Sequence, residues 1–189
     1  MLGAVLSLMK FYSCLLTLSF ILLNTSTGYS QKISLMHQWS PSLAYVQGDG
    51  FEGVVFSKEF AFPFISMDSI EKRFTPTKEE IEEAEDLLNK NLKAVNRFKI
   101  KQGGENGPVI DTNLGGFVRQ YFGYCTKAGD KVVYISCLLR NNYRSTAAGI
   151  PTWLKGAVFV LNGGSNYWQV QANLNKASLF GLEVNSIDK

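Results

Sequence analysis

The sequence has 189 residues, of which 46% are apolar and 13% aromatic, and a formal net charge of +3. This length and composition allow one domain with a substantial core and exclude the polar, highly charged composition of a disordered chain. Lysine and arginine form no dense run along the chain. Neither a nucleic acid nor an anionic membrane is therefore predicted as a partner.

The first 30 residues have the layout of a secretory signal. Residues 11–23 form an unbroken run of apolar and small hydroxyl residues, and a small polar stretch, residues 24–30, follows it. Lys10 directly precedes the apolar run, as the cation of a signal segment does. Because Met9 stands next to this cation, we expect translation to begin at Met9.

The predicted cleavage site lies before Gln31, because the small residues Gly28 and Ser30 occupy the positions three and one residues upstream. The alternative is an uncleaved anchor, since a chain that begins at Met1 has a segment approaching the length of a bilayer span. We expect an exported protein, periplasmic, on the cell surface or secreted, with no membrane span after cleavage.

Residues 31–74 give a mixed pattern in which short apolar pieces alternate with turn signals. The turn signals are Ser40-Pro41 and Gly48-Asp49-Gly50. They predict an irregular N-terminal region with one or two short strands. We expect this region to form one globular unit with residues 75–189.

A long helix is predicted over residues 77–98. Thr77 and Glu80 have the spacing of a capping box, and acids crowd the first turns while bases crowd the last. Apolar residues recur at helical spacing and form one stripe, which consists of Ile81, Ala84, Leu88, Leu92 and Val95.

After the helix, the apolar period changes to two, which predicts strands. The predicted strands span residues 117–126, 131–139, 155–161, 167–174 and 178–184. A helix followed by a run of strands is typical of an α+β fold. The expected architecture is one long helix packed on an antiparallel meander sheet of about five strands.

The register of the first predicted hairpin depends on its turn. A two-residue turn at Ala128-Gly129 would place Lys127 opposite Asp130. Cys125 and Cys137 would then lie on opposite faces and remain unbridged. This register predicts one shared face that covers the helix stripe, made of Val118, Phe122, Tyr124, Val133, Ile135, Cys137 and Leu139.

No motif in the sequence names a catalytic mechanism. The Gly-rich stretch 103–116 lacks the lysine and serine of a phosphate-binding loop, and His37 has no second imidazole or cysteine pair at zinc spacing. We therefore predict no cofactor, no metal and no enzyme. The alternative is a small enzyme of unrecognised type that uses Cys125 as nucleophile with His37 as its base.

Aromatic and amide residues recur in the second half of the chain, at Arg119-Gln120-Tyr121, Asn162-Gly163-Gly164 and Tyr167-Trp168. Over about residues 75–185 the chain resembles small exported domains of uncharacterised function from Bacteroidetes. The resemblance implies a cystatin-like helix-plus-meander fold and carries no activity. The sequence departs from that pattern at Asn162, where those domains have an acid, and at Ser186, where they have a glycine.

The predicted function is an exported, non-catalytic binding or structural module for an unknown protein, peptide or glycan. Its candidate ligand-binding residues are Arg119, Tyr121, Tyr167 and Trp153. The alternative is a protease inhibitor that inserts a loop into the enzyme. Its candidate wedge is the connection 141–153, with the tip Ile150-Pro151-Thr152-Trp153.

Overall fold

A computed structural model describes residues 32–61, 70–97, 102–142 and 149–187. The predicted signal segment, residues 1–30, lies outside the described residues. Among the helices that are described, none has both the length and the apolar character that crossing a bilayer requires.

The described residues contain eight strands and one α-helix, linked in places by short 3-10 turns. The elements are β1 Ile33–Ser40, β2 Leu43–Gly48, β3 Phe51–Phe56, β4 Ile70–Phe74, α2 Lys78–Asn96, β5 Phe117–Thr126, β6 Lys131–Leu139, β7 Tyr167–Asn173 and β8 Ser178–Val184.

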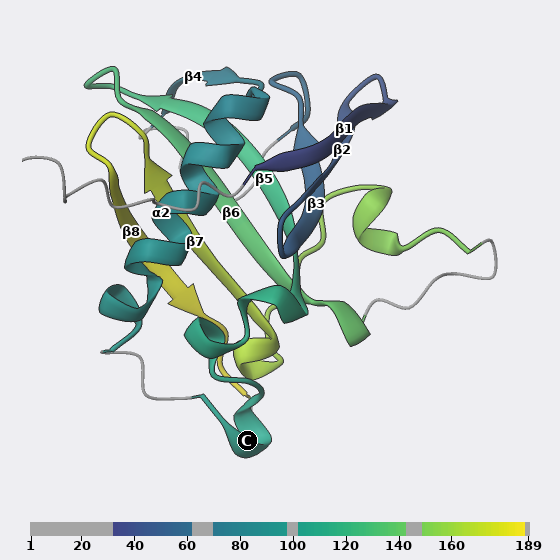
Figure 1. Ribbon diagram of the computed structural model, residues 1–189, viewed down its shortest axis with the longest axis vertical. Helices are drawn as coiled ribbons and strands as arrows, with labels where there is room; N and C mark the ends of the chain where they lie inside the picture. The colour runs from purple at the N-terminus through teal and green to yellow at the C-terminus, as the bar shows by residue number, and fades with distance from the viewer. Residues whose placement is uncertain (1–31, 62–69, 98–101, 143–148, 188–189) are drawn as a thin grey trace, which may run out of the picture.

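All eight strands belong to one sheet, and β5 lies at its centre. The strand order is β1-β2-β3-β5-β6-β7-β8, and β4 also pairs with β5. One edge of β5 pairs with β6. Its other edge pairs first with β3, in parallel, and then with β4, antiparallel. Figure 1 shows α2 lying across one face of this sheet, with β1–β3 toward one side and β7–β8 toward the other.

The prediction of a five-strand cystatin-like meander is wrong, because the structure has a large, mostly antiparallel sheet of eight described strands. The region 31–74 contributes four of these strands rather than one or two. Three of them join the rest through the parallel pairing of β3 with β5. A pairing between segments so distant in the sequence leaves no mark on local periodicity.

The predicted strand 155–161 is also wrong, since these residues form no strand. The four other strands of the second half are confirmed, and three of them have the predicted bounds. The observed strand β7 is one residue shorter than the predicted strand 167–174, because it ends at Asn173.

The helix prediction is confirmed. The Thr77 side chain accepts from the amide of Glu80 while Glu80 accepts from the amide of Thr77, so both bonds of the capping box are present. The predicted stripe is buried apart from Val95, which is half-buried. In addition, the amide of Ile33 donates to Glu82 (2.6 Å) and ties β1 to the helix.

The predicted register of the β5–β6 hairpin is wrong by one residue. The turn has three residues rather than two, since the amide of Thr126 donates to the carbonyl of Asp130 (2.9 Å) and Cys125 pairs with Lys131. Gly129 has a φ of +87°, the left-handed conformation that closes such a loop. The one-residue shift places Val118, Phe122 and Tyr124 on the face away from the helix.

The two described cysteines are free and buried. In the observed register, Cys137 pairs with Arg119, so both thiols lie on the same face of the sheet. The expectation of opposite faces is therefore wrong. Arg119, the partner of Cys137, lies six positions from Cys125 along β5, which is about 20 Å at about 3.3 Å per residue.

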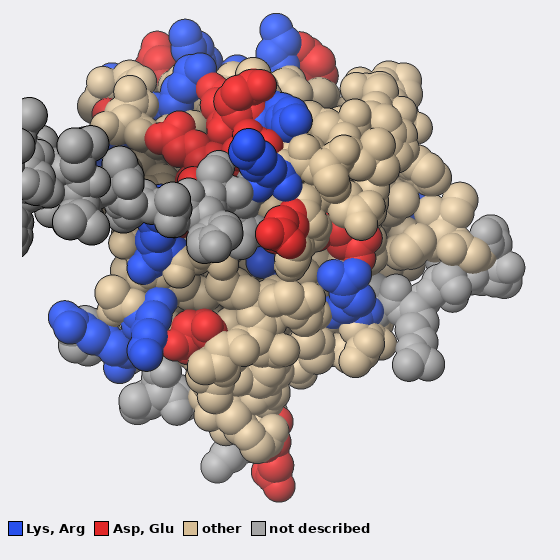
Figure 2. Space-filling view, viewed as in Figure 1, with Lys and Arg blue, Asp and Glu red and all other residues tan. Residues whose placement is uncertain are grey.

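The sheet has a core on each face. The face that carries α2, here called the helix face, packs the helix stripe against residues such as Phe117, Tyr121 and Ile135. The opposite face, here called the outer face, carries a second core that includes Phe56, Phe122 and Trp153. Figure 2 shows both acidic and basic residues on the helix side, where the first turn of α2 carries Glu79 and Glu80 and its last turn carries Lys93.

A buried ion pair fixes α2 on the helix face. Glu85 and Arg119 expose 0% and 1% of their surface, and the Arg119 Nε donates to Glu85 Oε1 over 3.2 Å. The hydroxyl of Tyr121 donates to the same oxygen (2.9 Å). Arg119 also donates to the carbonyls of Leu114 (2.9 Å) and Phe117 (2.6 Å). Burial, together with the Glu85 carboxylate, raises the pKa of Tyr121 well above its usual value.

We predict that Glu85→Ala lowers the free energy of unfolding by about 3–5 kcal/mol, because it leaves a buried guanidinium without its counter-charge. The double variant Glu85→Leu/Arg119→Met should recover a large part of this loss, since neither charge remains. Glu83→Ala, at an exposed position of the same helix, is the control and should change the value by about 0.5 kcal/mol or less. Urea denaturation followed by circular dichroism gives these values, and equal losses for Glu85→Ala and Glu83→Ala would contradict the role of the pair.

Candidate binding site

A polar row crosses the middle of the outer face. Gln120 on β5 lies opposite Ser136 on β6, and Ser136 lies opposite Gln169 on β7. A row of rings runs beside it, where Phe122 meets Tyr134 edge to face at a centroid distance of 6.1 Å. Alternation along the three strands places all these side chains on one face of the sheet.

A segment here called the strap, residues 153–162, covers part of the outer face. The buried side chain of Gln120 holds its first half, because its amide nitrogen donates to the carbonyls of Trp153 (3.0 Å) and Gly156 (2.8 Å). The amide oxygen of Gln120 accepts from the amide of Val158 (2.9 Å). One glutamine thus makes three hydrogen bonds to the strap.

The end of the strap is attached near the end of β8. The side-chain amide of Asn185 donates to the carbonyl of Val160, and Asn162 forms a bridge with Ser186. The amides of Gly163 and Gly164 both donate to the carbonyl of Ser186 (3.2 Å each). Gly164 has a φ of +60°, and a Cβ there would lie 2.3 Å from the carbonyl oxygen of Asn106. The strap is therefore fixed at both ends.

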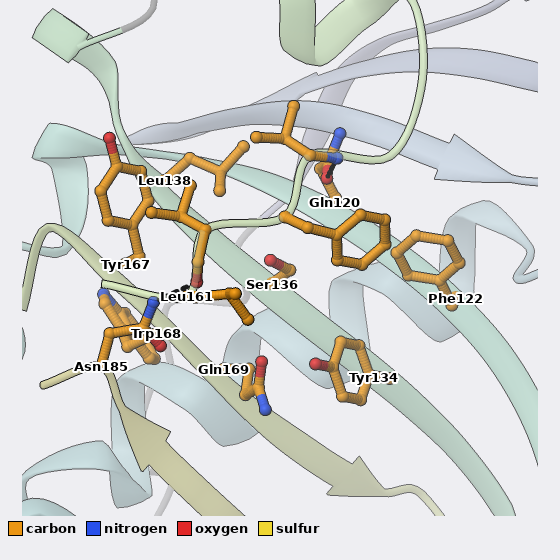
Figure 3. Close-up of a pocket in the computed structure, with 13 residues that line it drawn as sticks. Gln120, Phe122, Tyr134, Ser136, Leu138, Leu161, Tyr167, Trp168, Gln169 and Asn185 are labelled. Carbon is orange, nitrogen blue, oxygen red and sulfur yellow. Dashed lines mark hydrogen bonds between the residues drawn. The ribbon is translucent and has the colours of Figure 1, made fainter. Parts of the chain in front are cut away.

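A cavity of about 230 Å³ lies between the strap and the sheet (Figure 3). Residues 158–161 of the strap form one wall, and the sheet provides the floor. Among the described residues, no charged side chain lines the cavity. The main floor and side-wall residues are Gln120, Phe122, Tyr134, Ser136, Tyr167 and Gln169.

Three polar atoms in the cavity remain available to a ligand. The hydroxyl of Ser136 makes no hydrogen bond to any described residue, and Figure 3 shows it near the middle of the floor. Gln169 donates through its amide nitrogen to Glu183 (2.6 Å), which leaves its carbonyl oxygen. The carbonyl oxygen of Asn185 is likewise without a donor among the described residues. Burial, with the Glu183 carboxylate nearby, raises the pKa of Tyr134, so its phenol is neutral at physiological pH.

The strap side of the cavity exposes apolar surface. Phe159 and Leu161 both line the cavity, and they expose 47% and 91% of their surface. The floor rings of Phe122 and Tyr134, by contrast, expose only 1% and 3%. The cavity thus has an apolar mouth above a neutral floor with a few hydrogen-bonding groups.

The four predicted ligand-binding residues lie in three different places. Arg119 and Tyr121 are buried beneath α2 on the helix face, bound to Glu85. Tyr167 lines the outer-face cavity, and its hydroxyl accepts from Asn142 (3.3 Å). Trp153 is buried at the start of the strap, 6.4 Å from the ring of Tyr45.

The residues of the two alternative functions are not brought together either. Cys125 lies on the helix face. His37 is exposed on β1 and belongs to the outer face, because it pairs across the strands with Tyr45, then Val54, and finally Gln120. In the expected inhibitor loop, Trp153 is buried rather than exposed, and residues 143–148 lie outside the described residues. Across the described ranges, no group of three or more His, Cys, Asp or Glu is placed to hold a metal ion.

The sequence reasoning did not find Ser136, Gln169 or the strap. Gln169 lies in a strand whose alternation predicts one solvent-facing side, which was a usable signal. Ser136 stands between two apolar residues and gives no signal of its own. The strap reads as a strand because its residues alternate, although it crosses the sheet without pairing into it.

Comparison with known proteins identifies no relative of this chain. No family model matches the chain, and searches of the curated proteins and of the solved structures find no match.

We predict that Gln120→Leu loosens the strap while leaving the fold intact, because it removes all three side-chain hydrogen bonds to residues 153–158. Each backbone group that is left buried and unpaired costs about 1–3 kcal/mol. The amide of Val158 should therefore exchange with solvent deuterium at least about tenfold faster.

The matched control for this experiment is Gln169→Leu, a glutamine on the same face that makes no hydrogen bond to the strap. It should leave the exchange rate of the Val158 amide unchanged. Equal rates in the wild type and in Gln120→Leu would mean that Gln120 does not hold the strap.

Proposed function

We propose that the protein is an exported, non-catalytic binding module whose ligand occupies the outer-face cavity. The observation that carries this proposal is the free hydroxyl of Ser136 in the floor of a neutral, walled cavity. Binding sites for small groups are concave, mostly apolar and supplied with a few convergent polar atoms. The cavity beneath the strap has each of these properties.

The side chains around Ser136 favour binding over chemistry. Its cross-strand neighbours are Gln120 and Gln169, and both are amides. A serine nucleophile needs a base within hydrogen-bond reach, whereas an amide neither takes up a proton nor gives one up near neutral pH. Hydrogen bonding to a ligand is the role that these groups support.

Export is part of this proposal and rests on the signal-like pattern of residues 9–30. The expected ligand is therefore a molecule of the cell envelope or of the surroundings. The two described cysteines, Cys125 and Cys137, are consistent with an oxidising compartment, since both are buried and about 20 Å apart along the sheet.

The test is a ligand-observed NMR screen of the purified mature chain with small neutral and charged fragments. We expect neutral fragments to bind the wild type and to lose binding in Ser136→Phe, whose ring fills the cavity. Ser34→Phe, the same substitution on the exposed strand β1, is the control and should bind like the wild type. Fragments that bind Ser136→Phe as tightly as the wild type, or a wild type that binds no fragment, would disprove the proposal.

A further inference from the structure

We infer that the ligand is an uncharged, apolar segment of another polypeptide, which places one apolar side chain beneath the strap and covers Phe159 and Leu161. This inference rests on the proposed function and names the class of ligand for the same cavity.

The mouth of the cavity supplies the first argument. Leu161 exposes 91% of its surface and Phe159 exposes 47%, and both belong to the wall of the cavity. Apolar side chains that are exposed singly need no explanation, but two on one wall of a cavity form a patch continuous with it. A partner that enters the cavity removes this apolar surface from water at the same time, which favours association.

The charge of the cavity supplies the second argument. Among the described residues, no Lys, Arg, Asp, Glu or His lines it, and the nearby Glu183 accepts from Gln169. A charged group that entered would lose its water, and none of the described residues that line the cavity carries a counter-charge. The inserted group is therefore uncharged.

The polar atoms of the cavity favour a polypeptide over a saccharide as the ligand. Each hydroxyl of a buried sugar ring needs a hydrogen-bond partner, and the described lining offers few side-chain groups for this: the Ser136 hydroxyl, the carbonyl oxygens of Gln169 and Asn185, and the phenols of Tyr134 and Tyr167. In the floor, the rings of Phe122 and Tyr134 are almost fully buried and offer no open face for a sugar to stack on, and the exposed ring of Phe159 lies at the mouth instead. An extended peptide brings one apolar side chain with an N–H and a C=O on either side, which matches this set.

The size of the cavity limits how much of the partner enters it. About 230 Å³ is less than the roughly 300–1,000 Å³ of pockets that enclose a whole drug-sized ligand. One side chain fits beneath the strap, and the flanking residues of the segment lie across the mouth, against Phe159 and Leu161.

The test measures binding of three probes to the full mature chain by NMR titration. The peptide probe is an N-acetylated, amidated pentapeptide of four alanines around a central phenylalanine. The second probe has aspartate in place of the phenylalanine, and the third is maltose. We expect the phenylalanine peptide to shift the resonances of Ser136 and Gln169, and the aspartate peptide and maltose to bind at least about tenfold more weakly.

Variants of the mouth keep the test independent of the cavity floor. The double variant Phe159→Ser/Leu161→Ser changes only exposed side chains and should weaken binding of the phenylalanine peptide at least about tenfold. Val109→Ser, at an apolar residue that is 42% exposed and does not line the cavity, is the matched control and should bind like the wild type.

The outcomes distinguish this inference from the proposed function. Maltose binding that Ser136→Phe abolishes, with no peptide binding, overturns the polypeptide ligand and keeps the cavity as a binding site. Peptide binding that neither Ser136→Phe nor the mouth variant weakens places the peptide elsewhere and overturns the inference. If Ser136→Phe weakens the binding of none of the three probes and the fragment screen finds no ligand, both this inference and the proposed function are overturned.

Discussion

The attachment of α2 to the sheet centres on the Glu85 carboxylate, which is buried between the helix and β5. It accepts from both Arg119 and Tyr121, two residues apart on the same side of the strand. Its second oxygen has no hydrogen-bond partner among the described residues. An apolar contact of similar volume is often as stable as such a pair, so we interpret the pair as fixing which part of α2 meets β5. Charge pairing is directional, whereas the packing of apolar residues on either side of it tolerates sliding.

The residue between those two partners organises the opposite side of the sheet. Because side chains alternate along a strand, Gln120 points to the outer face, where it holds the strap through three hydrogen bonds. Three consecutive residues of β5 therefore attach a helix on one face and an irregular segment on the other. The helix covers its face with a continuous core, but the strap pairs with no strand and covers only part of the outer face. The cavity over β6 and β7 is the part left open.

Sequence reasoning succeeded where the signal is local. The capping box at Thr77, the apolar stripe through Leu88 and the alternation along β5–β8 depend on neighbours within a few residues, so they could be predicted. The parallel pairing of β3 with β5 and the place of the strap depend on contacts between distant segments, which no local pattern records. One loop residue decided the hairpin register, and a slip of one position assigned Phe122 to the wrong face. The candidate site could not be found because it forms only where Ser136, Gln169 and the strap meet.

The attachment of the strap to a buried strand has a consequence for binding. A ligand that must order a loose loop loses affinity through the entropy of ordering it. Here the wall of the cavity is fixed before any ligand arrives, because Gln120 is buried and its chain neighbours Arg119 and Tyr121 are fixed on the helix face. The rigid core and the binding site thus share one strand, and a change that shifts β5 under the helix also moves the wall of the cavity. The stability of the helix face and the affinity of the outer face should therefore vary together whenever a substitution displaces β5.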